Sequence, residues 1–285
     1  MYAAIEAGGT KFVVAVADHD LNIVSRFKTA TEHPEVVMPR IISFLQQFEI
    51  ESIAVGSFGP IGVNPNLANY GKIKHTPKKG WQDFDFLGNL KRFFDVPIYW
   101  TTDVNIAAYG ELKMGAAQGK KNIVYLTVGT GIGGGVIVDG QIMTGYSHPE
   151  IGHILMQPMA GDDFKGVCPY HAYCLEGVAA GPALGARAGK KAELLEINDP
   201  IWDTEAFYLA QGVCDLTVAF APEMVIFGGG VSNQNQIFDK IRKSFKEQLN
   251  NYVDVPELDQ YIVHAGLGND AGIIGGLLLA KEIVQ

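Results

Sequence analysis

The fold is decided by residues 123–140, which have the sequence IVYLTVGTGIGGGVIVDG. Its first six residues are apolar and typical of a buried strand, and Gly129 to Gly135 predict a glycine turn. Val136 to Val138 predict a second strand, Asp139-Gly140 is a tight-turn signal, and residues 141–144 predict a third strand. We therefore expect the order strand, glycine turn, strand, tight turn, strand.

The same order of elements occurs about 120 residues earlier. Residues 2–7 predict a strand, Gly8-Gly9-Thr10-Lys11 a glycine turn, and Phe12 to Ala17 a second strand. Asp18-His19-Asp20 turns the chain into a third strand over Ile23 to Phe27. Two unrelated hairpins would give the same pattern, but the repeat favours two related α/β lobes that face each other across a cleft.

The remaining periodic segments fit such a pair of lobes. Further strands are expected over residues 52–57, 96–100 and 224–227, and helices over residues 36–48, 205–220, 236–249 and 271–284. A small, polar stretch at residues 115–121 marks the lobe boundary. We expect a first lobe of residues 1–117, completed by the C-terminal helix 271–285, and a second lobe of residues 118–270.

Composition limits the classes of function. The 285 residues are 47% hydrophobic and 19% charged, with a formal net charge of −9, which argues against nucleic-acid or anionic-membrane partners. No apolar run reaches the roughly 18 residues of a membrane span, and the first residues lack the pattern of a signal peptide. Three cysteines are too few for a disulfide framework, so we expect a reducing, cytoplasmic setting.

The two glycine turns predict phosphate binding. Successive backbone N–H groups in such a turn can hold phosphate oxygens, and glycine permits their close approach. Thr10 and Thr130 add hydroxyl groups, and Lys11 adds a positive charge. Neither turn matches the P-loop pattern, and neither is followed by a helix as the dinucleotide fingerprint requires.

Asp103 is a candidate catalytic residue. It follows the strand ending at Trp100 and begins a segment with helical spacing, at the strand end where α/β sheets bind ligands. A carboxylate there could remove the proton from a sugar hydroxyl that attacks phosphorus. Aspartate also caps helices very often, and position alone favours the cap.

A run of soft and borderline ligands predicts zinc. Cys168, His171 and Cys174 form a Cys-x-x-His-x-x-Cys pattern, and either His148 or His153 could complete a tetrahedral Cys₂His₂ site. The alternative is a chance grouping. Four protein ligands would make the zinc structural, because a catalytic zinc keeps one position open.

Together these motifs resemble those of the ROK family of sugar kinases and repressors, in the same order and across essentially the whole chain. They are Glu6 to Lys11, Leu126 to Gly135, Asp103-Val104-Asn105, Glu150 to His153, and the cysteine/histidine run that ends in Cys174-Leu175-Glu176. The bacterial fructokinases of the family also share Ser57 to Pro60, Thr76 to Trp81 and Cys-Pro-Tyr-His-x-x-Cys.

The resemblance implies an actin/hexokinase-like (ribonuclease H-like) fold with a duplicated βββαβαβα core, and ATP-dependent phosphorylation of D-fructose to fructose 6-phosphate. It implies that Asp103 is the general base and that Gly59, Pro60, Asn105, Glu150 and Glu176 bind the sugar. The implied nucleotide contacts are Gly8, Gly9, Thr10, Lys11, Thr130, Gly131, Pro182, Gly228, Gly229, Gly230 and Val231. The implied zinc ligands are His153, Cys168, His171 and Cys174.

The resemblance also implies a homodimer and Mg²⁺ bound with ATP. Many family members have Asp where this chain has Glu6, so Glu6 would contact magnesium through a water rather than directly. Another sugar, such as glucose, mannose or N-acetylmannosamine, stays open as the substrate. A repressor of the family would carry a DNA-binding segment before the first phosphate turn, which here begins at residue 6. A non-catalytic sugar-binding protein is the remaining alternative.

Overall fold

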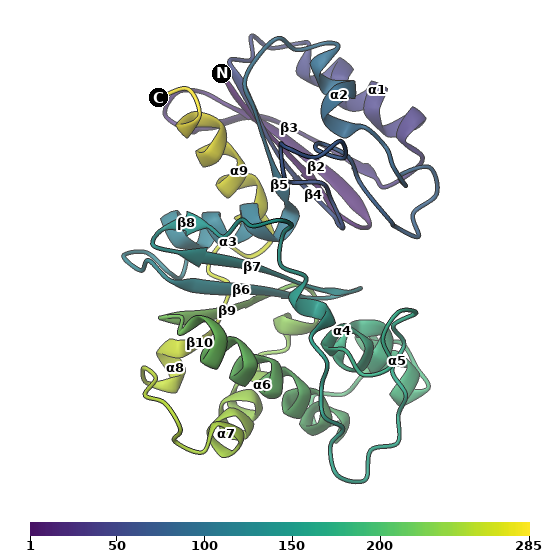
Figure 1. The fold of residues 1–285 in the computed structure, drawn as a ribbon, viewed down its shortest axis with the longest axis vertical. Helices are drawn as coiled ribbons and strands as arrows, with labels where there is room; N and C mark the ends of the chain where they lie inside the picture. Colours follow the sequence, from purple (N-terminus) through teal and green to yellow (C-terminus); the bar gives the residue numbers. More distant parts are fainter. The chain divides into compact units, whose positions relative to one another are not determined.

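The computed structural model describes residues 1–285, which form two compact units (Figure 1). Unit 1 comprises Met1–Gly115, Ile142–Pro149 and Asn269–Gln285. Unit 2 comprises Ala116–Gln141 and Glu150–Gly268. Each unit contains one five-stranded sheet with helices packed against it.

The sheet of unit 1 has the strand order β3-β2-β1-β4-β5. Its strands are β1 (Tyr2–Ala7), β2 (Lys11–Ala17), β3 (Ile23–Ala30), β4 (Ser52–Ser57) and β5 (Ile98–Thr102). β1 is antiparallel to β2 and parallel to β4, and β5 is parallel to β4. The carboxyl ends of β1, β4 and β5 therefore lie at the same edge of the sheet, which is where such sheets position ligand-binding groups.

Helices cover both faces of this sheet. Figure 1 shows α1 (Pro34–Leu45) and α2 (Phe86–Lys91) on one face and α9 (Ala271–Glu282) on the other, with α3 (Asp103–Met114) beside α9. On the α1 side, the buried Trp81 stacks on Phe12 with ring centroids 5.2 Å apart. This aromatic contact fixes the loop before α2 to the start of β2.

Helices α3 and α9 pack backbone to backbone. A Cβ atom placed on Gly275 would overlap the carbonyl oxygen of Ile106, and one placed on Gly110 would overlap that of Ala271. At the next residue of α9, a Cβ atom on Gly276 would come within 2.8 Å of Ala4 Cβ in the central strand. Only glycine fits at these contacts, so α9 is held closely against both α3 and β1.

The sheet of unit 2 repeats the first, with the order β10-β9-β6-β7-β8. Its strands are β6 (Ile123–Val128), β7 (Ile132–Val138), β8 (Gln141–Ile142), β9 (Met224–Gly228) and β10 (Ile262–His264). The helices are α4 (Leu175–Ala179), α5 (Gly181–Ala188), α6 (Ile201–Phe220), α7 (Ile237–Leu249) and α8 (Leu258–Tyr261), and short 3₁₀ turns occur at η1 (Ile151–His153), η2 (Ala192–Leu194), η3 (Val231–Asn233) and η4 (Gly268–Asp270). Figure 1 shows α4 to α7 on one side of this sheet, where they share one hydrophobic core with it.

The strand orders confirm the duplicated fold, with two corrections. The predicted glycine turn over 129–135 is too long, because β7 begins at Ile132 and Gly133 to Gly135 belong to the strand. Ile151 packs there, and its Cδ1 lies 2.7 Å from where a Cβ on Gly134 would be, so small residues are needed inside this strand. The third strand ends at Ile142 rather than at residue 144. No helix combines the length and apolar character required to cross a membrane.

Candidate active site

The first glycine turn of unit 1 lies between β1 and β2. Its hairpin is closed by a hydrogen bond of 3.0 Å from the Gly8 N–H to the Lys11 carbonyl oxygen. The Thr31 hydroxyl donates to the Gly8 carbonyl oxygen at 2.8 Å, and the Thr31 N–H donates to Thr10 O at 3.0 Å. Gly9, Thr10 and Lys11 are exposed. The turn is therefore fixed at its base, and its outer groups are available to a ligand.

Asp103 is the first residue of α3 and directly follows β5. The interpretation of Asp103 as the helix cap is wrong, because the cap is Thr102, whose hydroxyl oxygen accepts the Asn105 N–H at 3.3 Å. Asp103 Oδ1 accepts the Val104 N–H at 2.9 Å. Burial raises the pKa of Asp103 to about 6, against the opposing effects of its backbone hydrogen bonds and the Lys78 charge. A carboxylate with this pKa is suited to accept a proton near neutral pH.

Two charged side chains accompany Asp103 in unit 1. Glu6 is near the end of β1, and burial, followed by repulsion from Asp103, raises its pKa to about 7. Its Oε2 is buried without a hydrogen-bond partner. Lys78 donates to the Gly9 carbonyl oxygen of the first glycine turn, and burial lowers the pKa of its ammonium group while Asp103 opposes that effect. The sequence analysis assigned Lys78 no role of its own and noted it only within the Thr76 to Trp81 stretch shared with the bacterial fructokinases.

Asn105 and the Gly59-Pro60 segment also lie in unit 1. Asn105 is 2% exposed, and its Nδ2 donates to Thr101 Oγ1 at 2.9 Å, whereas its Oδ1 has no donor. A buried acceptor without a donor fits a ligand hydroxyl. Directly after Pro60, the Ile61 N–H donates to His148 Nε2 at 3.0 Å. His148 therefore braces this loop.

The second glycine turn, Gly129 to Gly131, lies between β6 and β7 in unit 2. The Gly129 N–H donates to Gly131 O at 2.9 Å, and the Gly129 carbonyl oxygen accepts the Gly181 N–H at 2.8 Å. Glu176 in α4 adds a side-chain contact, because its Oε2 accepts the Ile132 N–H at 3.0 Å. The same oxygen is 2.5 Å from where a Cβ on Gly131 would be. The turn is thus held by both α4 and the start of α5.

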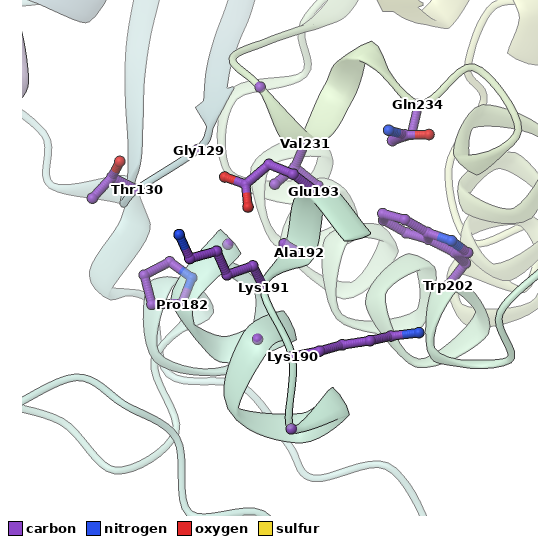
Figure 2. Close-up of a pocket in the computed structure, with 14 residues that line it drawn as sticks. Gly129, Thr130, Pro182, Lys190, Lys191, Ala192, Glu193, Trp202, Val231 and Gln234 are labelled. Carbon is purple, nitrogen blue, oxygen red and sulfur yellow. The ribbon is translucent and has the colours of Figure 1, made fainter. Parts of the chain in front are cut away.

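A pocket of about 860 Å³ in unit 2 lies beside this turn (Figure 2). Its volume is within the roughly 300–1,000 Å³ of small-molecule sites. It brings together Thr130, Pro182, Gly230 and Val231 from the predicted nucleotide contacts, and it also includes Gly129 and Gly181. Gly131, Gly228 and Gly229 do not line it.

The pocket also has lining residues that the sequence analysis missed, notably Lys190, Lys191, Glu193, Trp202 and Gln234. Figure 2 shows Lys191 and Glu193 from the segment after α5, on the side of Thr130 and Val231, with Trp202 and Gln234 farther along. The lysine side chains at this cavity suit an anionic ligand, and the Glu193 carboxylate can accept hydrogen bonds from ligand N–H or O–H groups. The segment gave no periodic signal, so only the folded chain could reveal these residues.

The predicted metal ligands lie together in unit 2. One ligand atom from each of His153, Cys168, His171 and Cys174 lies within 4.8 Å of the others. Cys168 Sγ is 3.8 Å from His153 Nδ1 and 3.9 Å from His171 Nδ1. A tetrahedral zinc with ordinary bond lengths separates S and N ligands by about 3.6 Å, so the group fits zinc. Of the two candidate histidines, the structure selects His153, because His148 binds Ile61.

The loop that leads into the metal-ligand group is tied to α5 and α6 by a buried charge network. Asp162, whose side chain is 8% exposed, accepts two hydrogen bonds of 2.8 Å from Arg187 and one from the Tyr208 hydroxyl. The Arg187 hydrogen bonds, which are the largest cause, lower the pKa of Asp162 to about 2. Arg187 also stacks on Phe164, with its guanidinium carbon 4.1 Å from the ring centroid.

Comparison with known proteins places the chain in a family. Residues 2–283 match the ROK family. A fructokinase from Pediococcus pentosaceus is 51% identical over 285 residues, which cover 100% of this chain and 99% of that protein. A ROK hexokinase structure from Thermus thermophilus aligns with a TM-score of 0.81 at 27% identity, covering 99% of this chain and 98% of the other. A ROK family glucokinase from Streptomyces griseus, crystallised with glucose and AMPPNP, gives a TM-score of 0.77 at 27% identity over 99% of both chains. This chain therefore belongs to the ROK family.

Proposed function

We propose that this protein is an ATP-dependent hexose kinase that converts D-fructose to fructose 6-phosphate. The observation that carries the proposal is Asp103, a partly buried carboxylate that directly follows β5 and whose pKa is raised to about 6 by burial. The choice of fructose over glucose is supported by similarity, since the Pediococcus fructokinase is 51% identical and the Streptomyces griseus glucokinase 27%.

In the proposed mechanism, Asp103 removes the proton from the C6 hydroxyl as the C6 oxygen attacks the terminal phosphorus of ATP, and the bond from that phosphorus to the bridging oxygen breaks to release ADP. The free Oδ1 of Asn105 accepts a sugar hydroxyl, and Gly59, Pro60, Glu150 and Glu176 complete the proposed sugar contacts. Backbone N–H groups of the two glycine turns bind the phosphates, which is the main way that enzymes stabilise phosphoryl transfer. Mg²⁺, when bound with ATP, would supply further positive charge to the phosphates, and Glu6, whose Oε2 has no hydrogen-bond partner, is the carboxylate that would hold a magnesium-bound water.

We propose that the nucleotide occupies the pocket of unit 2. Thr130, Pro182, Gly230 and Val231 line that pocket, and Gly131 lies in the adjoining turn. Gly228 and Gly229 act indirectly, by shaping the end of β9. A Cβ on Gly228 would overlap the Tyr125 hydroxyl, and Gly229 has φ of 87°. On the side of unit 1, Gly8 to Lys11 would approach the phosphates.

We further propose that His153, Cys168, His171 and Cys174 hold one structural zinc ion. Its ligands come from η1, from the loop before α4 and from the residue that caps α4, so the ion would fix this loop to the helix that carries Glu176. We also retain the predicted lobes of residues 1–117 with 271–285 and residues 118–270, and a homodimer, as proposals. Light scattering of the purified protein measures the oligomeric state.

The base role is tested with Asp103→Asn. The amide retains the shape and the acceptor for Val104 N–H but cannot take a proton. We expect kcat for fructose to fall by about 10²–10⁴, with dissociation constants for fructose and ATP changed little. Turnover within tenfold of the unmodified enzyme would exclude the role.

The substrate is tested by measuring kcat/KM for a panel of sugars with ATP and Mg²⁺. Fructose should give the highest value, ahead of glucose, mannose and N-acetylmannosamine. A higher value for another hexose would keep the kinase and replace its substrate. Sugar binding without ATP consumption would overturn the kinase proposal itself.

A further inference from the structure

Lys78 joins two parts of unit 1 that the proposed mechanism uses separately. Its Nζ donates to the carbonyl oxygen of Gly9 in the first glycine turn. The same atom lies 5.4 Å from the centroid of the Phe58 ring, a distance at which a cation is attracted to an aromatic face. The side chain is only partly exposed, so the ammonium group has a defined position at the turn.

The backbone around Lys78 is anchored to the core. The Trp81 N–H donates to Lys78 O at 3.1 Å, and Trp81 is 1% exposed. Its indole stacks on Phe12, which directly follows Lys11 at the end of the first glycine turn. Trp81 Nε1 also donates to Glu32 O at 2.7 Å. The loop that carries Lys78 is therefore fixed to the strand that carries the turn.

The charges around Asp103 give this cation a second effect. Burial disfavours the ionised carboxylate, and the Lys78 charge acts in the opposite direction, lowering the pKa of Asp103. On β1, the carboxylate of Glu6 repels that of Asp103. Lys11 and Lys28 lower the pKa of Glu6, and Asp270 raises it. The backbone N–H groups of Val104 and Asp103 offset the burial of Asp103 more than the Lys78 charge does, so the defined contact of Lys78 is the one with Gly9.

We propose that Lys78 is a positioning residue of the phosphoryl transfer, whose ammonium group fixes the first glycine turn through Gly9. The inference rests on the proposed binding of the ATP phosphates by that turn. The hydrogen bond to Gly9 and the contact with the Phe58 ring hold the turn in one position before the nucleotide binds.

Lys78→Gln, Lys78→Arg and Lys78→Met test the hydrogen bond to Gly9. Glutamine and arginine keep an N–H donor, so the KM for ATP should stay near that of the unmodified enzyme. Methionine has no donor, and we expect its KM for ATP to rise about 2- to 10-fold while kcat changes less. Lys79→Met, at the exposed neighbouring position, is the control and should leave the KM for ATP unchanged.

A direct measurement does not depend on turnover. In calorimetry without sugar, a non-hydrolysable ATP analogue should bind about 2- to 10-fold less tightly to Lys78→Met than to the unmodified enzyme and to Lys78→Arg. Unchanged binding of the analogue and an unchanged KM for ATP in folded Lys78→Met overturn the role of Lys78. If Asp103→Asn itself remains active, the proposed function fails instead, so the two failures are distinguishable.

Discussion

Asp103→Asn is expected to stabilise the folded protein while it removes activity. The pKa of Asp103 is 3.8 in its ordinary state and about 6 in the fold. Because the folded state binds this proton more tightly than the unfolded state, ionising Asp103 costs the fold about 3 kcal/mol, at 1.36 kcal/mol per pKa unit. The cost is absent well below pH 3.8, grows as pH rises from 3.8 to about 6, and is then nearly constant.

Asparagine avoids this cost, because it is neutral at every pH and its Oδ1 can still accept the Val104 N–H. The loss of the Asp103 charge also removes the repulsion that raises the pKa of Glu6, which changes stability in the same direction. The free energy of unfolding of Asp103→Asn should therefore exceed that of the unmodified protein by up to about 3 kcal/mol at pH 8, as worked from the pKa difference.

Urea denaturation at pH 8, 6 and 4, without sugar or nucleotide, measures this difference. The excess stability should shrink as pH falls and vanish near pH 4. Asp95→Asn, at an exposed aspartate of the same unit, is the matched control and should show no comparable gain. An Asp103→Asn protein that is less stable than its parent at pH 8, or whose advantage does not depend on pH, would refute the reasoning.

Three further predictions concern unit 2. Metal analysis should find about one zinc per chain, and Cys174→Ser should lose the zinc and have a lower Tm. Cys214→Ser, a control outside the metal group, should keep both the zinc and the Tm, and a fully stable, metal-free protein would contradict the site. Asp162→Asn should lower the free energy of unfolding by about 2 kcal/mol at pH 7, because the lowered pKa of Asp162 stabilises the fold above pH 3.8. That stabilisation is lost as pH falls towards 2, so a difference between the two proteins that persists at pH 2 would contradict this origin. Glu176→Ala should weaken binding of a non-hydrolysable ATP analogue about 2- to 10-fold in calorimetry without sugar. Glu176→Gln should weaken binding less, because its amide oxygen can still accept the Ile132 N–H, and equal binding by all three proteins would exclude a role of this hydrogen bond in shaping the turn.

The duplicated sheet could be predicted from the sequence because each glycine turn separates two apolar runs of strand length. The exact start of β7 could not be predicted, because Gly133 to Gly135 carry no side chains that would show a strand pattern. Glycine is needed in this strand because Ile151, 16 residues after Gly135, packs against it. The strand β10 has only three residues and gives no periodicity.

The candidate site was predictable where chemistry is concentrated in short motifs, as at Cys168 to Cys174. It was not predictable where the choice depends on what lies nearby in the fold. The residue pattern alone left His148 and His153 open and only the family resemblance favoured His153, whereas the fold places His153 with the other three ligands and His148 on Ile61. The sequence gives Lys78 no role of its own, because the Gly9 carbonyl that it contacts lies 69 residues away.

The tight packing of α9 on α3 and β1 bears on how the protein is made. Unit 1 includes Met1–Gly115, which a ribosome synthesises first, yet its sheet is covered on one face by Ala271–Glu282, which emerges more than 150 residues later. Most of unit 2 is a continuous segment, Glu150–Gly268, that can fold as soon as it leaves the ribosome. The order of completion is therefore opposite to the order of synthesis. Until α9 docks, the apolar face of β1 around Ala4 stays open to chaperones, and nonsense mutations that remove only the last helix should leave a folded unit 2 attached to an incomplete unit 1.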